Sequence, residues 1–319
     1  MLLFALLATL TQAADGGTAL HDGEGFVVSG GVKIWYRVEG AAQPGLPILL
    51  IHGGPGETAR PFERTIGPLL ALSRPVIYTD YRGAGRSERP KALTGYSFEQ
   101  FADDDEAIRK QLGIASWAVF GHSNGAATAV QFALRHREAT KAVVLCTPLL
   151  SPRDLEVNLA KKLLGASPAE AEKLRAIAKS GKGLPERFEA ANNAMRSSPN
   201  RMFYEPSNFL LFKAMQDQLN DELGGKGLMA GELWDGLVSH GFFAFDAFKL
   251  AGKLTMPVLV LDGAADSELS LDNGQVFAAT VPAGKFIAME RSGHFPYIEE
   301  TAGTTMVLEN FLDSLVHHD

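Results

Sequence analysis

The sequence contains a single cysteine, Cys146, among 319 residues. One cysteine excludes an internal disulfide, and it also excludes zinc or iron–sulfur sites built from several cysteines. A chain of this length can bury enough apolar surface to be stable without such cross-links. Cys146 ends an apolar run, as is typical of a small buried hydrophobic residue. We therefore expect a fold held together by an ordinary hydrophobic core.

The chain also lacks an excess of basic side chains, because 37 acidic residues stand against 30 basic ones, a formal charge of −7. Phosphate backbones are bound by clustered lysine and arginine, so no nucleic-acid partner is expected. Neither a Gly-x-Gly-x-x-Gly fingerprint nor a metal-ligand spacing is present, and we expect no cofactor and no metal. With 46% hydrophobic and 21% charged residues, the composition is that of a globular protein rather than a polytopic membrane protein.

The hydrophobic stretch at the start of the chain is too short to cross a bilayer. Residues 1–13, MLLFALLATLTQA, end in small residues and are typical of a signal-peptide core, although no lysine or arginine precedes them. We predict a signal peptide over 1–13 and a secreted or periplasmic mature protein with no stable membrane span. The alternatives are a cytoplasmic protein with a packed N-terminal arm, or an uncleaved anchor at a membrane.

Apolar and β-branched runs alternate with helical patterns through much of the chain. A hairpin across Gly30-Gly31 is expected first, and continuous apolar runs then indicate strands buried on both faces of a mostly parallel sheet. The predicted strands are Phe26–Ser29, Val32–Val38, Pro47–Ile51, Pro75–Thr79, Trp117–Phe120, Lys141–Cys146, Met256–Leu261 and Lys285–Glu290. Alternation of strands with helices predicts a doubly wound α/β sheet of eight strands.

Helical patterns separate these strands and interrupt the sheet once. The predicted helices of the sheet region are Arg60–Leu72, Ser97–Leu112 with a Ser97/Gln100 capping box, Ser123–Arg135 and Pro296–Val316. Between the sixth and seventh strands, amphipathic stretches such as Asp154–Leu164 and Pro168–Ala178 replace strand patterns. We therefore expect a core over 14–147 and 251–319, and a helical cap over 148–250 inserted after strand 6.

One short motif predicts a nucleophile. Gly121-His122-Ser123-Asn124-Gly125 follows a predicted strand directly and precedes a predicted helix. A Gly-x-Ser-x-Gly match is expected by chance roughly 0.2 times in such a composition, so the letters alone carry little weight. The strand–turn–helix placement carries more, because a sharp turn there lifts the serine hydroxyl above the sheet edge. The alternative is an ordinary glycine-rich turn.

A second glycine-rich turn, His52-Gly53-Gly54-Pro55-Gly56, follows the third predicted strand. In a parallel sheet the carboxyl ends of the strands lie at one edge, so this turn and Ser123 are expected at the same edge. Glycines allow close approach to a ligand and leave main-chain N–H groups free, as an oxyanion hole requires. A tight structural turn is the alternative, whereas a phosphate-binding loop is disfavoured because no Gly-Lys-Ser/Thr follows.

A serine nucleophile needs a base, and the base needs an orienting acid. In the order serine, acid, histidine, both are expected just beyond late strands. His294 follows the last predicted strand, and Asp266 follows the strand before it. We predict His294 as the base and Asp266 as the acid, with Asp262, which is closer to its strand, as the competing candidate.

These motifs together resemble the α/β-hydrolase fold. The His52–Gly56 turn with Asp80-Tyr81-Arg82-Gly83-Ala84-Gly85-Arg86-Ser87 resembles the proline iminopeptidase branch of serine peptidases, and the likeness covers about residues 24–317. The resemblance implies that the main-chain N–H groups of Gly54 and Asn124 form the oxyanion hole. Asn124 stands where iminopeptidases often carry tryptophan.

The resemblance also implies a substrate class. Family exopeptidases bind the substrate's free ammonium group with cap carboxylates, and Glu232 and Asp235 are the candidates here. We expect a small-molecule or short-peptide substrate, with release of N-terminal residues or cleavage of small amides. A carboxylesterase or lactonase with an apolar acyl pocket is the alternative, and a catalytically silent binding protein is a third reading. The sequence makes no prediction of the oligomeric state.

Overall fold

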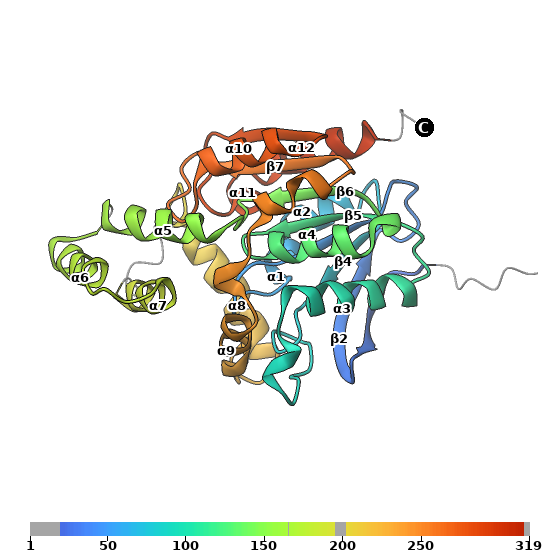
Figure 1. Ribbon diagram of the computed structural model, residues 1–319. Coiled ribbons are helices and arrows are strands. Elements are labelled where there is room, and N and C mark those ends of the chain that lie inside the picture. Colours follow the sequence, from blue (N-terminus) through green and yellow to red (C-terminus); the bar gives the residue numbers. More distant parts are fainter. Residues whose placement is uncertain (1–19, 165, 195–201, 316–319) are drawn as a thin grey trace, which may run out of the picture.

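The computed structural model describes residues 20–164, 166–194 and 202–315 (Figure 1). The predicted signal peptide, 1–13, lies outside the described residues. Eight strands of the described chain form one sheet in the order β1-β2-β4-β3-β5-β6-β7-β8. The strands are β1 Gly23–Ser29, β2 Val32–Glu39, β3 Ile48–Ile51, β4 Val76–Thr79, β5 Trp117–His122, β6 Thr140–Cys146, β7 Val258–Gly263 and β8 Gly284–Met289.

The sheet is parallel except at its N-terminal edge. Strand β2 runs antiparallel to both β1 and β4, and every other neighbouring pair is parallel. The β1–β2 hairpin turns at Gly30 and Gly31, both with positive φ, as a two-residue turn of this kind requires. Strands β3, β4 and β5 are buried along their whole length, in agreement with their continuous apolar sequences. The expected eight-stranded sheet is confirmed.

Helices cover both faces of the sheet. The α-helices of the sheet region are α1 Arg60–Arg64, α2 Ile66–Leu70, α3 Phe98–Gln111, α4 Gly125–Arg135, α10 Leu271–Thr280, α11 Pro296–Glu299 and α12 Thr301–Asp313. Apolar residues of α3, α4 and α10 pack in one core cluster, and those of α1, α2, α11 and α12 pack in a second cluster across the sheet. The strand ends between these two layers therefore form an edge on which loops can gather.

The described residues between β6 and β7 are mostly helical. Their α-helices are α5 Pro152–Leu164, α6 Pro168–Ala178, α7 Leu184–Ala194, α8 Asn208–Glu222 and α9 Gly231–Ser239. The short 3-10 helices η4 Phe242–Ala244, η5 Ala247–Lys249 and η6 Ala251–Lys253 follow α9 in this segment, whereas η1 Leu93–Gly95 and η2 Arg137–Ala139 belong to the sheet region. Figure 1 shows α6 and α7 projecting from the side of the sheet, with α5 leading out to them. In the described ranges, no helix is both long and apolar enough to span a membrane.

Two predicted helices are each broken in the structure. The predicted Arg60–Leu72 helix is interrupted at Thr65, whose φ and ψ are −127° and −103°. Pro68 explains the break, because a continuous helix would need an N–H at that position and would push its ring against the carbonyl of Arg64. The predicted Pro296–Val316 helix is interrupted at Glu300, and its last residue lies outside the described range.

The predicted capping box before α3 is present only in half. The Ser97 hydroxyl accepts a hydrogen bond from the Gln100 N–H, as an N-cap should. The Gln100 side chain, however, donates to Asp104 one turn further along the helix. The helix is therefore capped by the serine alone, and the glutamine belongs to a network within α3.

Candidate active site

The turn between β5 and α4 holds the predicted nucleophile in a strained conformation. Ser123 has a φ of +53°, a region that residues with a side chain seldom adopt. A Cβ at Gly125 would lie 2.5 Å from the carbonyl oxygen of His52, and a Cβ at Gly121 would press on the Gly125 backbone. Both glycines are therefore required by close backbone approach, and together they let β5 turn abruptly into α4 with the serine at the tip.

Ser123, His294 and Asp266 form one hydrogen-bonded chain. The Nε2 atom of His294 lies 3.0 Å from the Ser123 Oγ, and its Nδ1 lies 2.9 Å from Asp266 Oδ2. A carboxylate only accepts hydrogen bonds, so Nδ1 carries the proton, and in the neutral ring Nε2 is free to accept one from serine. The other oxygen of Asp266 accepts the N–H groups of Glu268 at 2.6 Å and Leu269 at 3.1 Å.

The electrostatic surroundings of Asp266 and His294 favour an ion pair between these two residues. Burial alone would raise the pKa of Asp266, but the charge and hydrogen bond of His294 and the two main-chain N–H donors outweigh it and lower that pKa. For His294, burial would lower the pKa, and the Asp266 carboxylate overcomes this effect and raises it. The structure therefore brings together a carboxylate that stays ionised and an imidazole made more basic by it.

Asp262, the competing acid, lies apart from the imidazole. Its side chain is 4% exposed, and neither of its oxygens has a hydrogen-bond partner among the described residues. Burial first, and then the nearby charge of Asp266, raises the pKa of Asp262 well above the usual range. Asp266 is therefore the acid in contact with His294.

The glycine-rich turn after β3 lies against the Ser123 turn. Gly54 and Asn124 both line the cavity described below, and neither main-chain N–H donates to another group in the described ranges. The His52 ring anchors this turn, because its Nδ1 donates to the Gly53 carbonyl and its Nε2 accepts the Tyr81 N–H. Burial lowers the pKa of His52, in keeping with this neutral form.

The Asp80–Ser87 segment supports the same turn from below. Asp80 accepts the N–H of Ala59 through Oδ1 and the N–H and Nε–H of Arg86 through Oδ2. The Ser87 hydroxyl donates to the Asp80 carbonyl. Together with the bond from Tyr81 to His52, these contacts join the two motifs into one buried unit. The second motif is therefore a scaffold for the first.

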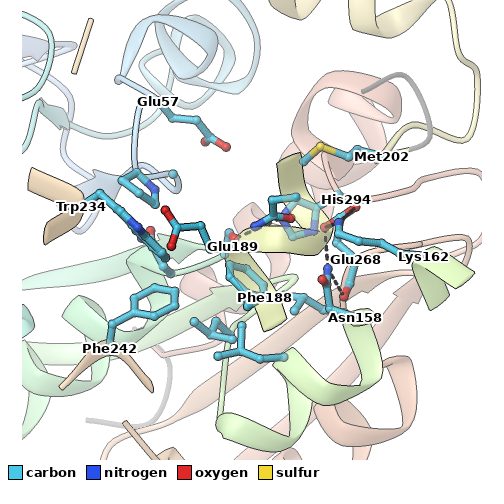
Figure 2. Close-up of a pocket in the computed structure, with 18 of the residues that line it drawn as sticks. Glu57, Asn158, Lys162, Phe188, Glu189, Met202, Trp234, Phe242, Glu268 and His294 are labelled. Atoms are coloured by element: carbon cyan, nitrogen blue, oxygen red, sulfur yellow. Dashed lines mark hydrogen bonds and ion pairs between the residues drawn. The ribbon is translucent and has the colours of Figure 1, made fainter. Parts of the chain in front are cut away.

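A cavity of about 840 Å³ opens beside Ser123 and His294 (Figure 2). It lies between the sheet edge and helices α5, α7 and α9 of the segment between β6 and β7. Its apolar wall includes Leu149, Leu155, Phe188, Trp234 and Phe242, and its charged residues are Glu57, Lys161, Lys162, Glu189 and Glu268. The space is large enough for a small organic molecule or a short peptide end.

The two carboxylates predicted to bind substrate are not in the cavity lining. Glu232 and Asp235 are both exposed on α9, whereas Trp234 lines the cavity. Successive helical residues differ by about 100° in direction, so the residues beside an inward tryptophan point elsewhere. The carboxylates that do line the cavity are Glu57, Glu189 and Glu268. Of these, Glu268 is paired with Lys162 at 2.7 Å.

Glu57 and His122 meet beneath the nucleophile, a contact that no motif in the sequence indicates. The Nε2 of His122 lies 2.8 Å from the carbonyl oxygen of His294 and must donate to it. Its Nδ1 lies 3.4 Å from Glu57 Oε2. Burial alone would raise the pKa of Glu57, but His122 and the other nearby histidines lower it. The Tyr297 hydroxyl lies at the same distance, 3.4 Å, from this Nδ1 atom.

Comparisons with known proteins identify the family of this chain. Residues 47–301 match the family described as alpha/beta hydrolase fold. The chain belongs to the α/β-hydrolase family. It is 27% identical over 305 residues to the proline iminopeptidase of Heyndrickxia coagulans, a match that covers 92% of this chain and 99% of that protein. It is 24% identical over 314 residues to the proline iminopeptidase of Saccharolobus solfataricus, covering 94% and 95%.

Among solved structures, the proline iminopeptidase of Mycobacterium smegmatis superposes with a TM-score of 0.73 at 20% identity, covering 93% of this chain and 100% of that one. At that identity the superposition bears on the fold alone. The expected fold, the resemblance to the proline iminopeptidase branch and the expected class of enzyme, a hydrolase, are confirmed by these matches.

Proposed function

We propose that this α/β-hydrolase is a serine hydrolase that works through an acyl-enzyme. Ser123 is the nucleophile, His294 the general base and Asp266 the acid that orients the imidazole. The observation that carries the proposal is the continuous chain of hydrogen bonds from Asp266 through His294 to Ser123, 2.9 Å and 3.0 Å long, at the wall of a large cavity. Within the described residues, no group of metal-binding side chains offers a competing centre.

The reaction proceeds in two steps. Ser123 Oγ attacks the substrate carbonyl carbon while His294 Nε2 accepts the hydroxyl proton, and the imidazolium then gives that proton to the leaving group. Water attacks the acyl-enzyme with His294 again as the base, which releases the acid and restores the serine. Asp266 stabilises the imidazolium in both steps, in keeping with its lowered pKa.

The tetrahedral intermediate places a negative charge on the former carbonyl oxygen. We assign the main-chain N–H groups of Gly54 and Asn124 to this oxyanion. Both residues line the cavity beside Ser123, and both N–H groups have no acceptor in the described chain. The buried His52 ring fixes the first of these turns, and so this donor does not have to reorganise during the reaction.

The substrate class proposed is a small amide with a free amino terminus, from which the enzyme releases the N-terminal residue. The similarity to proline iminopeptidases supports this choice. Glu57 and Glu189 supply cavity carboxylates for an ammonium group, and the apolar wall accepts a side chain such as a pyrrolidine ring. Glu232 and Asp235 are not proposed for this role, because they lie on the exposed side of α9.

A second candidate is a carboxylesterase or lactonase, favoured by the apolar wall formed by Leu149, Leu155, Phe188, Trp234 and Phe242. Prolyl and alanyl p-nitroanilides, compared with p-nitrophenyl esters of increasing chain length, separate the two. We expect aminoacyl anilides to be cleaved and N-acetylated anilides to be poor substrates. Faster turnover of long-chain esters, with no cleavage of any anilide, would establish the esterase instead.

The variant Glu189→Gln tests the ammonium site directly. We expect it to raise KM for aminoacyl anilides about tenfold or more, as for a lost charged hydrogen bond, and to leave ester hydrolysis within a few-fold. Glu232→Gln is the matched control, since it removes the same charge from an exposed position outside the lining. Equal KM for both variants would rule out Glu189 as the ammonium partner.

We also propose the expected division of the chain, with a hydrolase core over 14–147 and 251–319 and a cap over 148–250. The helical segment α5–α9 between β6 and β7 supports it, because helices of this segment form one wall of the cavity.

A further inference from the structure

Helix α5 contacts the turn that carries Asp266 through a lysine ammonium. Lys161 Nζ donates to the main-chain carbonyl oxygen of Asp266 at 2.5 Å, and it also donates to the carbonyl oxygen of Leu269. Lys161 is 105 residues away from Asp266 in sequence. A single side chain from outside the sheet therefore closes the turn over residues 266–269 across both of its ends.

Two more residues on the same face of α5 bind the middle of the turn. Asn158 precedes Lys161 by three positions and Lys162 by four, the spacing that places side chains on one side of a helix. Asn158 Nδ2 donates to the Glu268 carbonyl oxygen at 3.1 Å, and Lys162 Nζ lies 2.7 Å from the Glu268 carboxylate. Figure 2 shows Asn158, Lys162 and Glu268 together on one side of the cavity.

The direction of the main-chain groups explains why the 266–269 turn depends on the Lys161 ammonium. The N–H groups of Glu268 and Leu269 point to the Asp266 carboxylate, which directs that carboxylate towards His294. The carbonyl groups of Asp266 and Leu269 bind the Lys161 ammonium instead. Both residues are 7% exposed, so without Lys161 these carbonyls would be largely buried with no donor. The turn would then change conformation to satisfy them.

We propose that Lys161 is a positioning residue for the catalytic acid, and that helix α5 thereby takes part in catalysis as well as in forming the cavity. The inference rests on the proposed function, in which Asp266 orients His294. Lys161 fixes the carbonyl side of the 266–269 turn, and the carboxylate on its other side stays aligned with Nδ1 of the imidazole.

A positioning role and a purely electrostatic role of Lys161 predict opposite pH effects. The carboxylates that raise the pKa of His294 are Asp266, then Glu268 and Glu57. If the loss of Lys161 displaces Asp266, the imidazole loses its main partner and its pKa falls. If Lys161 acted only through its positive charge, removing that charge would raise the pKa of His294.

The test uses the full-length enzyme with the substitutions Lys161→Met, Lys161→Arg and Arg153→Met. Arg153 is an exposed cation on α5 with no role in the site, so Arg153→Met is the matched loss of one positive charge. Labelling with a fluorophosphonate gives the fraction of protein with a reactive Ser123, and all rates are divided by that fraction. The kcat and the pH profile of kcat/KM are then measured with the best substrate of the panel.

We expect Lys161→Met to lower kcat on the order of 10²-fold, as for a misplacement of about 1 Å, and to move the acid limb of kcat/KM to lower pH. Lys161→Arg should restore much of the rate, because it keeps the charge and the donors. Arg153→Met should behave as the wild type. An acid limb that moves to higher pH, or a corrected kcat within threefold of the wild type, would overturn the proposal.

Failure of the inference is distinct from failure of the proposed function. Ser123→Ala, assayed alongside, should abolish turnover and phosphonate labelling. If it does so while Lys161→Met retains normal kcat and a normal acid limb, the serine mechanism stands and the role of Lys161 is refuted. If Ser123→Ala retains activity, the proposed function itself is refuted.

Discussion

Replacing Asp266 by asparagine tests the proposed mechanism most directly, because the structure dictates how the new amide must lie. Oδ1 of Asp266 accepts two main-chain N–H groups, from Glu268 and Leu269. An amide nitrogen cannot accept them, so in Asp266→Asn the amide oxygen takes the Oδ1 position. Its NH₂ group then takes the position of Oδ2, which lies 2.9 Å from His294 Nδ1.

This orientation of the amide changes the tautomer of the His294 imidazole. A donor facing Nδ1 forces that nitrogen to become the acceptor, so the ring proton moves to Nε2, which can no longer take the proton of Ser123. A wrong tautomer of this kind costs on the order of 10⁴ in kcat, or about 5.4 kcal/mol of transition-state stabilisation. Steady-state assays with the best panel substrate measure this loss of kcat, and circular dichroism checks the fold of the variant.

Asp262→Asn is the matched control for this experiment. Asp262 is buried without a hydrogen-bond partner among the described residues, and burial raises its pKa, so an isosteric neutral amide is a conservative replacement there. We expect its kcat to stay within about tenfold of the wild type, since every 1.36 kcal/mol is one factor of ten. If Asp262→Asn loses activity and Asp266→Asn retains it, the assignment of the acid is wrong.

Five further outcomes are expected from the geometry of the site. Ser123→Ala should lower kcat by about 10⁴ to 10⁶, measured with enzyme free of wild-type contamination. In the wild type, kcat/KM should fall on acidification through a pKa above the ordinary histidine value, since His294 must be neutral to act as a base and its pKa is raised. Glu57→Gln removes one of the carboxylates that raise the pKa of His294, so the acid limb of this variant should lie at lower pH. Asp262→Asn should resist urea better than the wild type at pH 7 and equally well at about pH 4. Folding raises the pKa of Asp262, so the wild-type protein loses folding stability as the pH rises above the unfolded-state pKa of roughly 3.9, and the asparagine variant does not. Gly125→Ala should cost about 1–3 kcal/mol in urea unfolding, because its Cβ would lie 2.5 Å from the His52 carbonyl oxygen; unchanged stability would contradict the close approach of the two turns.

Much of the sheet and of the site could be predicted because both follow local rules. A continuous apolar run such as Ile48–Ile51 must be buried on both sides, and its β-branched ends favour a strand. Parallel strands then bring their carboxyl ends to one edge, so Ser123, Asp266 and His294 could be placed together from their positions after three strands. Their order along the chain was enough to select Ser123 and His294, but it left Asp262 and Asp266 as alternative acids.

The helical segment between β6 and β7 could be predicted only as a set of helices. An amphipathic pattern tells which face of a helix is apolar, but not which other element that face meets. Trp234 faces the cavity, and Glu232 and Asp235, chosen for their charge and position in the chain, do not. Likewise, nothing near Lys161 in sequence indicates that it binds a turn 105 residues away.

The amino-acid sequence by itself determined the α/β fold, the sharp serine turn and the serine and histidine proposed to act in catalysis, because hydrophobic periodicity and glycine-dependent turns act over a few residues. Only the tertiary structure decided which carboxylate meets His294, which acids face the cavity, and that Glu57 and Lys161 contact the groups around Ser123 and Asp266. These choices depend on burial and on donor–acceptor geometry between segments far apart in the chain. Such contacts exist only after the chain has packed.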